Sequence, residues 1–86
     1  MAWRIEFKAS VEKDFRKLEA KDRERILQFL EKKVSPNPRT VGSPLKASDL
    51  WRYRLGKFRI ICMINDEAVS VLVVRISHRR EAYRNI

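Results

Sequence analysis

The residues best suited to chemistry in this sequence are three arginines that follow one another closely in its second half. Arg52 and Arg54 are separated by one residue, and Arg59 comes shortly after a Gly56-Lys57 pair. A guanidinium group stays protonated at physiological pH, and its planar fork matches two phosphate oxygens at once. This residue type at this spacing therefore indicates recognition of phosphate.

Strand alternation predicts that the first two of these arginines lie together. In residues 51–55, aromatic and apolar side chains alternate with Arg52 and Arg54. Because successive side chains of a strand point to opposite faces, both arginines must leave the sheet on the face away from the core. The aromatic side chains Trp51 and Tyr53, like those of Trp3 and Phe58, are expected to pack rather than to stack on bases.

The third arginine, Arg59, lies on the expected return strand of the same hairpin, residues 58–64. If it faces outward as well, three guanidiniums converge on one surface. Like charges facing each other across strands oppose folding by roughly a few tenths of a kcal/mol per pair. We therefore expect an anion to occupy the space between them. The alternative is that they pair with Glu6 or another carboxylate.

The charge of the whole chain favours the same interpretation. Its 86 residues include 20 basic and 11 acidic residues, for a net charge of +9. The first fifty residues carry twelve basic and eight acidic residues, whereas the remainder carries eight basic and three acidic ones. Seven of the eight basic residues after position 50 are arginine. Solubility requires no such bias, and a polyanionic partner explains it.

Composition excludes several classes of protein. The chain length fits one domain, residues 1–86, with one modest core. At 44% hydrophobic and 36% charged residues, the chain is too apolar for disorder, and no apolar run is long enough to span a bilayer or to serve as a signal peptide. Cys62 is the one cysteine and His78 the one histidine, so neither a disulfide nor a zinc site can be assembled. We expect a cytoplasmic protein without a metal or other cofactor.

The first half of the chain predicts a strand and two helices. Residues 3–8 alternate apolar and charged side chains, as a half-buried strand does. Ser10 is expected to cap a short helix and Asp22 a second one. The inner face of the second helix is expected to carry Ile26, Leu27, Leu30 and Val34.

The second half predicts a three-stranded meander. Residues 35–50 hold all three prolines and are expected to form an irregular connection. After the hairpin, residues 68–76 read as a central strand that is apolar on both faces. Arg75 interrupts this strand and, by strict alternation, shares a face with Val71 and Val73; it either joins the arginines or pairs with a carboxylate. The predicted fold is α+β: an N-terminal strand, a two-helix hairpin, an antiparallel meander and a short basic tail.

Three segments together resemble the RelE/ParE superfamily of toxins. Residues 37–46 contain a Pro-Leu-Lys loop, residues 51–61 contain an Arg-x-Arg strand and a Gly-x-Phe-Arg return, and residues 76–84 contain His-Arg-Arg-x-x-Tyr-Arg. With the strand–helix–helix entry, the resemblance covers nearly the whole chain. It implies a RelE-like, microbial-RNase-like fold. Fold alone does not select a function, because the superfamily contains both RNases and gyrase inhibitors.

The residues favour the RelE type, a ribosome-dependent and metal-independent mRNA endonuclease that cuts in the ribosomal A site. The resemblance implies contacts with mRNA and 16S ribosomal RNA, and a cognate antitoxin as partner. Alternatives are a ParE-like inhibitor of DNA gyrase and an RNA-binding module without catalysis. The catalytic set matched to the family is Arg52, Arg54, Arg59, Arg79 and Tyr83. The expected RNA-binding residues are Lys46, Lys57, His78, Arg80 and Arg84.

The implied reaction is attack of an RNA 2′-hydroxyl on the adjacent phosphorus, with departure of the 5′-oxygen. Arg52 and Arg54 stand where the best-known relatives have lysine. Arginine is a poor general base because its pKa lies above about 12. Three sources for the base stay open: the ribosome or the RNA itself, Tyr83 in a positive environment, and His78, which otherwise caps the end of its strand.

Overall fold

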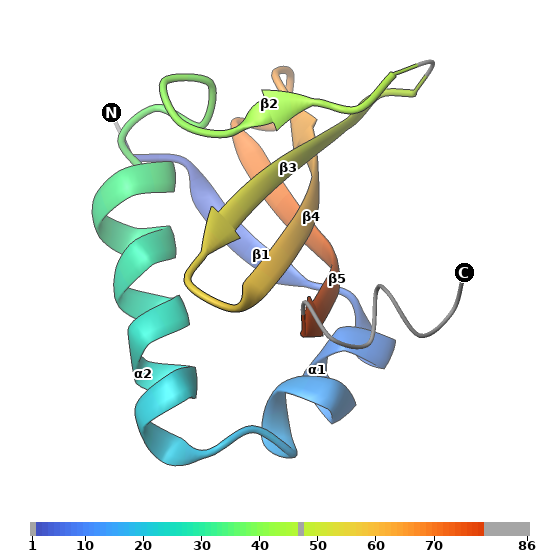
Figure 1. Ribbon diagram of the computed structural model, residues 1–86. Coiled ribbons are helices and arrows are strands. Elements are labelled where there is room, and N and C mark those ends of the chain that lie inside the picture. Colours follow the sequence, from blue (N-terminus) through green and yellow to red (C-terminus); the bar gives the residue numbers. More distant parts are fainter. Residues whose placement is uncertain (1, 47, 79–86) are drawn as a thin grey trace.

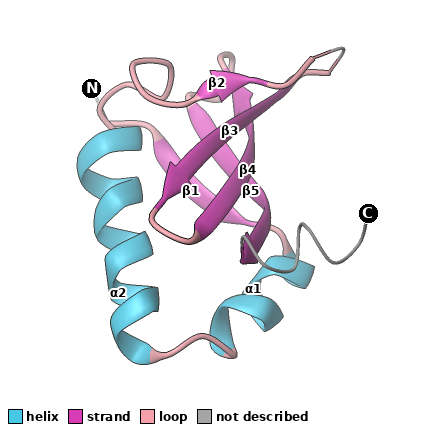
Figure 2. Ribbon diagram, in the orientation of Figure 1, coloured by secondary structure: helices cyan, strands magenta, loops and turns pink. Residues whose placement is uncertain are grey.

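The computed structural model describes residues 2–46 and 48–78, which form helices and a five-stranded mixed sheet (Figures 1 and 2). The elements, in chain order, are β1 (Arg4–Phe7), α1 (Ala9–Arg16), α2 (Ala20–Phe29), the π-helical turn η1 (Leu30–Val34), β2 (Ser43–Pro44), β3 (Leu50–Leu55), β4 (Phe58–Asn65) and β5 (Ser70–His78). This architecture confirms the α+β prediction. No helix in the described part of the chain is long and apolar enough to cross a membrane.

The sheet has the strand order β1-β5-β4-β3-β2. The predicted meander is formed by β3, β4 and β5, which pair antiparallel, and β1 adds to β5 in parallel. β5 is therefore central, as its apolar character on both faces predicted. The short strand β2 was not predicted; it pairs with β3 inside the connection expected to be irregular. The predicted basic tail lies outside the described residues.

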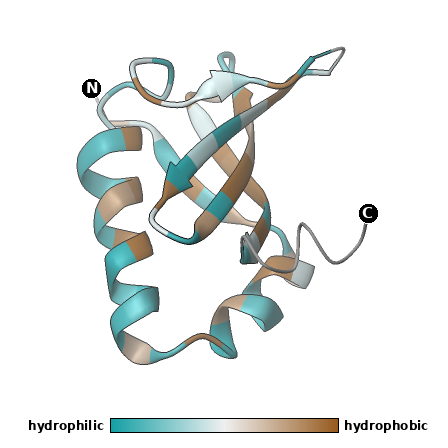
Figure 3. Ribbon diagram, viewed as in Figure 1, coloured by the Kyte–Doolittle hydropathy of each residue, from teal (hydrophilic) through white to brown (hydrophobic). Residues whose placement is uncertain are grey.

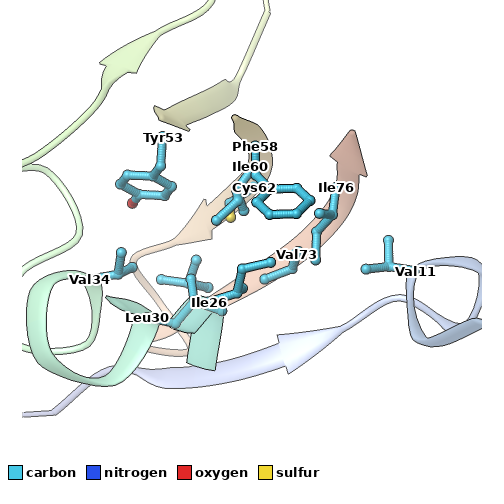
Figure 4. Packing of buried hydrophobic residues seen from close by; sticks show 11 residues of the cluster. Val11, Ile26, Leu30, Val34, Tyr53, Phe58, Ile60, Cys62, Val73 and Ile76 are labelled. Carbon is cyan, nitrogen blue, oxygen red and sulfur yellow. The ribbon is translucent and has the colours of Figure 1, made fainter. Parts of the chain in front are cut away.

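The core lies between the sheet and the helices (Figure 4). Tyr53 and Ile60, which pair across β3 and β4, are completely buried on this side and pack with Ile26 and Leu30 of the helical segment. Figure 3 shows the same division as hydropathy, with brown segments on the strands and the inner side of the helix. The hairpin turn has positive φ only at Gly56, which fits a two-residue type II′ turn.

Both predicted helix caps were wrong. The amide of Lys8 still bonds to the carbonyl of Val73 in the sheet, so the chain leaves the sheet there and α1 begins directly afterwards, with Ser10 inside its first turn. α2 begins after Glu19, so Asp22 lies in the first turn. A carboxylate in that turn is still stabilised by the helix dipole.

The expected inner face of the second helix holds, except at one position. Ile26, Leu30 and Val34 are buried, at most 1% exposed, whereas Leu27 is 40% exposed. The buried three recur every four residues and form one stripe, and Leu27 falls beside it. Phe29 is half-buried and packs against the core instead, with its ring 5.8 Å from that of Tyr53 in an edge-on arrangement.

The loop before β2 is held against β3 by two hydrogen bonds. The hydroxyl of Tyr53 donates to the carbonyl of Pro38 at 2.7 Å, and the indole Nε1 of Trp51 donates to the carbonyl of Val41 at 2.8 Å. Gly42, at φ +74°, closes the loop so tightly that an added Cβ would overlap the carbonyl oxygen of Arg52. The loop is therefore packed onto the strand that carries two of the arginines.

We predict that Gly42→Ala lowers the free energy of unfolding by about 3 kcal/mol, because it combines a left-handed backbone with a clash against fixed atoms. Gly56→Ala is the matched control. It also has positive φ, but the nearest atoms to its added Cβ belong to the flexible side chain of Arg25 at 3.3 Å, and we expect a loss of about 1 kcal/mol. Urea unfolding measures both; equal losses would contradict the tight closure at Gly42.

The thiol of Cys62 is fully buried in the core, and this burial raises its pKa to about 12. We predict that a thiol reagent labels the native protein at pH 8 only through unfolding, because the reactive thiolate is suppressed below that pKa. The control combines Cys62→Ala with Met63→Cys, which moves the thiol to a neighbouring position that is 46% exposed in the wild type. Equal labelling of both proteins in the absence of denaturant would disprove burial of Cys62.

Candidate functional site

The face of the sheet away from α2 carries Arg52 and Arg54, as the alternation predicted, and the strand register adds Arg59 to them. Arg54 and Arg59 are direct cross-strand partners in the β3–β4 hairpin. Such partners have their Cβ atoms about 4.5–5.5 Å apart on the same face of the sheet. Arg52 lies one row further along β3, opposite Ile61. We call this surface the open face.

The alternative that carboxylates neutralise these arginines does not hold within residues 2–46 and 48–78. Glu6 pairs with Arg4 at 2.8 Å instead. The other ion pairs there join Arg39 to Asp66 and Lys57 to Asp22. Arg52 makes one long hydrogen bond of 3.5 Å, to the hydroxyl of Ser43. The positive charge of the cluster is thus left for an external anion.

A fourth arginine, Arg75, joins the open face, and its predicted side was wrong. The β4–β5 register pairs Cys62 with Val73 but Ile61 with Arg75, so Val74 is an extra residue on β5. Such a bulge reverses the alternation beyond it. Arg75 therefore lies on the face opposite to Val73, beside Ile61, and it is exposed.

Lys8 is a further cation of the open face that sequence reasoning did not select. It follows β1 directly and lines the same hollow as Val74 and Arg75. Its position in the alternating residues 3–8 was a usable signal for its face. Only the parallel pairing of β1 with β5 brings it close to the arginines.

Four of the cations of the open face surround a hollow of about 580 Å³, here called the basic groove: Lys8, Arg52, Arg59 and Arg75, but not Arg54. Its cations lie around apolar side chains, and no residue lining it within the described chain is a carboxylate or a histidine. The groove can therefore hold a phosphodiester against charged donors and a base against an apolar floor, but offers no proton acceptor near neutral pH. It is lined by Lys8, Leu45, Leu50, Arg52, Arg59, Ile61, Val74, Arg75 and Ser77.

The other end of the open face has the opposite character. Leu50, Met63 and Leu72 form a row across three strands there, on the floor of a second hollow of about 800 Å³. Carboxylates line it, and one of them, Asp66, accepts two hydrogen bonds from Arg39, which lower the pKa of that carboxyl group. We call this end the acidic end; its carboxylates are Glu6, Asp49, Asp66 and Glu67.

Two of the expected RNA-binding residues lie away from the basic groove. The Nζ atom of Lys57 is 3.9 Å from the carboxylate of Asp22 and 5.6 Å from the centre of the Phe58 ring. His78 pairs with Phe58 across the strands and packs edge-on against it, with the ring centres 5.6 Å apart. Since Phe58 is a core residue, both side chains lie on its side of the sheet rather than among the arginines.

The other expected site residues are Lys46 and four residues of the tail. Lys46 is exposed in the connection between β2 and β3, at the end of β3 opposite to Arg54. Outside the described residues lie Arg79, Arg80, Tyr83 and Arg84. Within the described residues, no group of three or more histidine, cysteine or acidic side chains is arranged to hold a metal ion.

We predict that Arg54→Thr raises the free energy of unfolding by about 0.5 kcal/mol at low salt, because it removes a like-charge cross-strand pair. The gain should shrink in 0.5 M NaCl, where the repulsion between exposed charges is screened. Arg4→Thr, which removes an arginine paired with Glu6, is the control and should give no gain. Urea unfolding at two salt concentrations measures this; a destabilised Arg54→Thr protein would show that the pair does not repel.

Similar structures repeat this fold in toxins. The toxin in the RelBE2 toxin–antitoxin complex of Mycobacterium tuberculosis has a TM-score of 0.85 and 26% identity, covering 92% of this chain and 100% of that one. The RelE chain of an archaeal RelE–RelB complex from Pyrococcus horikoshii OT3 has a TM-score of 0.70 and 26% identity, covering 92% and 97%. A free E. coli RelE double mutant, at 24% identity and a TM-score of 0.80, covers 96% and 90% and shows the fold alone.

Sequence comparison leads to the same group. The chain is 28% identical to toxin RelG of Mycobacterium tuberculosis over 86 residues, which are 98% of this chain and 99% of that protein. Residues 5–83 match the family described as the ParE toxin of the type II toxin–antitoxin system parDE. The chain therefore belongs to the ParE toxin family, within the RelE/ParE superfamily of type II toxins.

Proposed function

We propose that this toxin is a RelE-type endoribonuclease that cleaves mRNA in the ribosomal A site. The observation that carries the proposal is the basic groove, in which Arg52 and Arg59 face outward without a carboxylate partner among the described residues. A protein that required arginines here only for solubility would not place Arg54 directly opposite Arg59. Phosphate oxygens are the ligands that such a cluster fits best.

The proposed reaction is transesterification without a metal ion. The 2′-hydroxyl of one nucleotide attacks the adjacent phosphorus, and the 5′-oxygen of the next nucleotide leaves. Arg52, Arg54 and Arg59, with Arg79 from the tail, stabilise the negative charge that builds up on the phosphorus oxygens. Tyr83 stacks on a base or orients the 2′-hydroxyl.

These arginines do not supply the general base that removes the proton of the 2′-hydroxyl. The ring of His78 packs against Phe58 and not in the basic groove, which favours a structural role for it. This leaves Tyr83, or a group of the ribosome or the RNA, as the acceptor. Dependence on a ribosome fits this assignment, because the ribosome would hold the RNA in the groove, whose described lining residues supply no base.

The cognate antitoxin is the proposed protein partner. Two of the similar structures named above are toxin–antitoxin complexes. A chain of net charge +9 attracts an acidic segment, and such a segment on the open face would exclude RNA. Action on ribosomes and capture by this partner place the proposed site of action in the cytoplasm.

Inhibition of DNA gyrase is the second candidate. It is favoured by one observation, the match of residues 5–83 to the ParE family description. A gyrase inhibitor needs no cluster of arginines at a scissile phosphate, so the two functions differ in what Arg59 contributes.

An RNA-binding module is the remaining alternative. In that case the basic groove binds RNA in a salt-dependent way, but the protein cuts none.

We predict that primer extension on a defined mRNA in a reconstituted translation reaction shows cuts at A-site codons that require ribosomes. Arg59→Ala should slow these cuts at least about a hundredfold, as loss of one charged transition-state contact does. The control is Arg4→Ala, which removes an equal charge at the acidic end of the open face. This variant should cleave mRNA at the wild-type rate.

Three outcomes would decide against this proposal. Intact mRNA together with blocked supercoiling by gyrase would establish the second candidate. Binding of RNA without cleavage in any reaction would leave the RNA-binding module. Equal loss of cleavage in both arginine variants would show that net charge, rather than the groove, is responsible.

A further inference from the structure

We infer that Lys8 and Arg75 form a second phosphate subsite, so that bound RNA crosses the strands of the open face instead of running along them. This inference rests on the proposed function, because it assigns one phosphate of the same RNA to the arginine pair of the hairpin. It adds Lys8, which sequence reasoning did not select, and Arg75, which the alternation assigned to the other face. Both are exposed in the structure and line the basic groove.

The cations form a band across the sheet. Arg54 on β3 lies opposite Arg59 on β4; one row away, Arg75 on β5 lies opposite Ile61 on β4. Lys8 extends the band beyond β5, since it directly follows β1, the parallel neighbour of β5. Four adjacent strands span about 14 Å at about 4.8 Å per spacing. A band of this length accommodates two neighbouring phosphates of a single strand, one near each end.

The acidic end argues against an RNA path that runs along the strands. A chain running along β4 from Arg59 would pass Ile61 and arrive over Met63, where the carboxylates of Glu6, Asp49, Asp66 and Glu67 line the second hollow. Phosphate would be repelled there. Two of these carboxylates are paired with arginines, Glu6 with Arg4 at 2.8 Å and Asp66 with Arg39 at 2.8 and 2.9 Å. Asp49 and Glu67 have no ion pair among the described residues and supply the repulsion. The electrostatics of the open face therefore favour a path across the strands.

The floor between the two subsites is apolar. Ile61 and Val74 lie next to each other beneath the band, and Leu45 and Leu50 complete the lining on the side of β3. A base placed between two bound phosphates would cover these side chains and remove their apolar surface from water. The alternation of charge and apolar surface thus matches the alternation of phosphate and base in a single strand.

The second subsite is expected to position the RNA rather than to take part in the reaction. Lys8 and Arg75 touch a neighbouring phosphate, which fixes which phosphodiester lies at the Arg54–Arg59 pair. Each phosphate of a single strand that the protein neutralises contributes about 0.7 to the slope of log affinity against log salt concentration. The two residues should therefore be visible in binding even where nothing is cleaved.

The test is an NMR titration of the toxin with 2′-O-methyl RNA, which lacks the attacking hydroxyl and cannot be cut. A dinucleotide offers one internucleotide phosphate and a tetranucleotide offers three. We expect Lys8→Gln with Arg75→Gln to weaken tetranucleotide binding about tenfold, the size of a lost charge-assisted contact. Dinucleotide binding should stay within about twofold, and the tetranucleotide salt slope should fall by about 0.7, the value for one phosphate.

The matched control is Arg4→Gln with Lys13→Gln, which removes two exposed positive charges outside the basic groove. An equal loss in this control, or wild-type tetranucleotide binding by the Lys8/Arg75 variant, would overturn the subsite. The result is separable from the cleavage proposal because no ribosome and no reaction are involved. Loss of cleavage in Arg59→Ala beside unchanged binding in the Lys8/Arg75 variant would retain the enzyme and reject the subsite.

Discussion

The register between β3 and β4 is the constraint on which the rest of the structure depends. Tyr53 and Ile60 meet across this register and are completely buried against the helices. Because side chains alternate strictly, burying these two places Arg52, Arg54 and Arg59 on the other face. A slip by one residue would bury the arginines and expose the core residues. The packing that stabilises the fold is therefore the same interaction that assembles the groove.

The charges on the open face are sorted along the strands, and the ion pairs Arg4–Glu6 and Arg39–Asp66 form at the acidic end rather than among the arginines of the hairpin. The hairpin end is cationic, and the far end carries the carboxylates that line the second hollow. Water on this face keeps the repulsion between the arginines small enough for the core to overcome. An anion that enters the groove removes the repulsion and gains charged donors at once. Under the proposed function, this cluster would bind RNA on the surface of a small domain, and an acidic antitoxin segment would compete for the same charges.

The sequence alone determined those features that depend on local pattern. The period of two in residues 51–55 placed Arg52 and Arg54 on one face, and the apolar character of residues 68–76 made that strand central. Prolines and glycines marked the long connection and the hairpin turn. These features follow from backbone geometry and burial within a few residues, so no knowledge of distant contacts is required. The resemblance in residues 37–46, 51–61 and 76–84 identified the superfamily on the same local basis.

Only the tertiary structure decided which distant residues share the groove. The bulge at Val74 depends on how β5 pairs with β4, and it moves Arg75 to the open face against the alternation of its own strand. Lys8 reaches the groove because β1 pairs in parallel with β5, and the start of α1 shifts because Lys8 stays bonded to the sheet. The exposure of Leu27 depends on where the helix rests. Each of these outcomes is fixed by packing between segments far apart in the chain, where local periodicity carries no information.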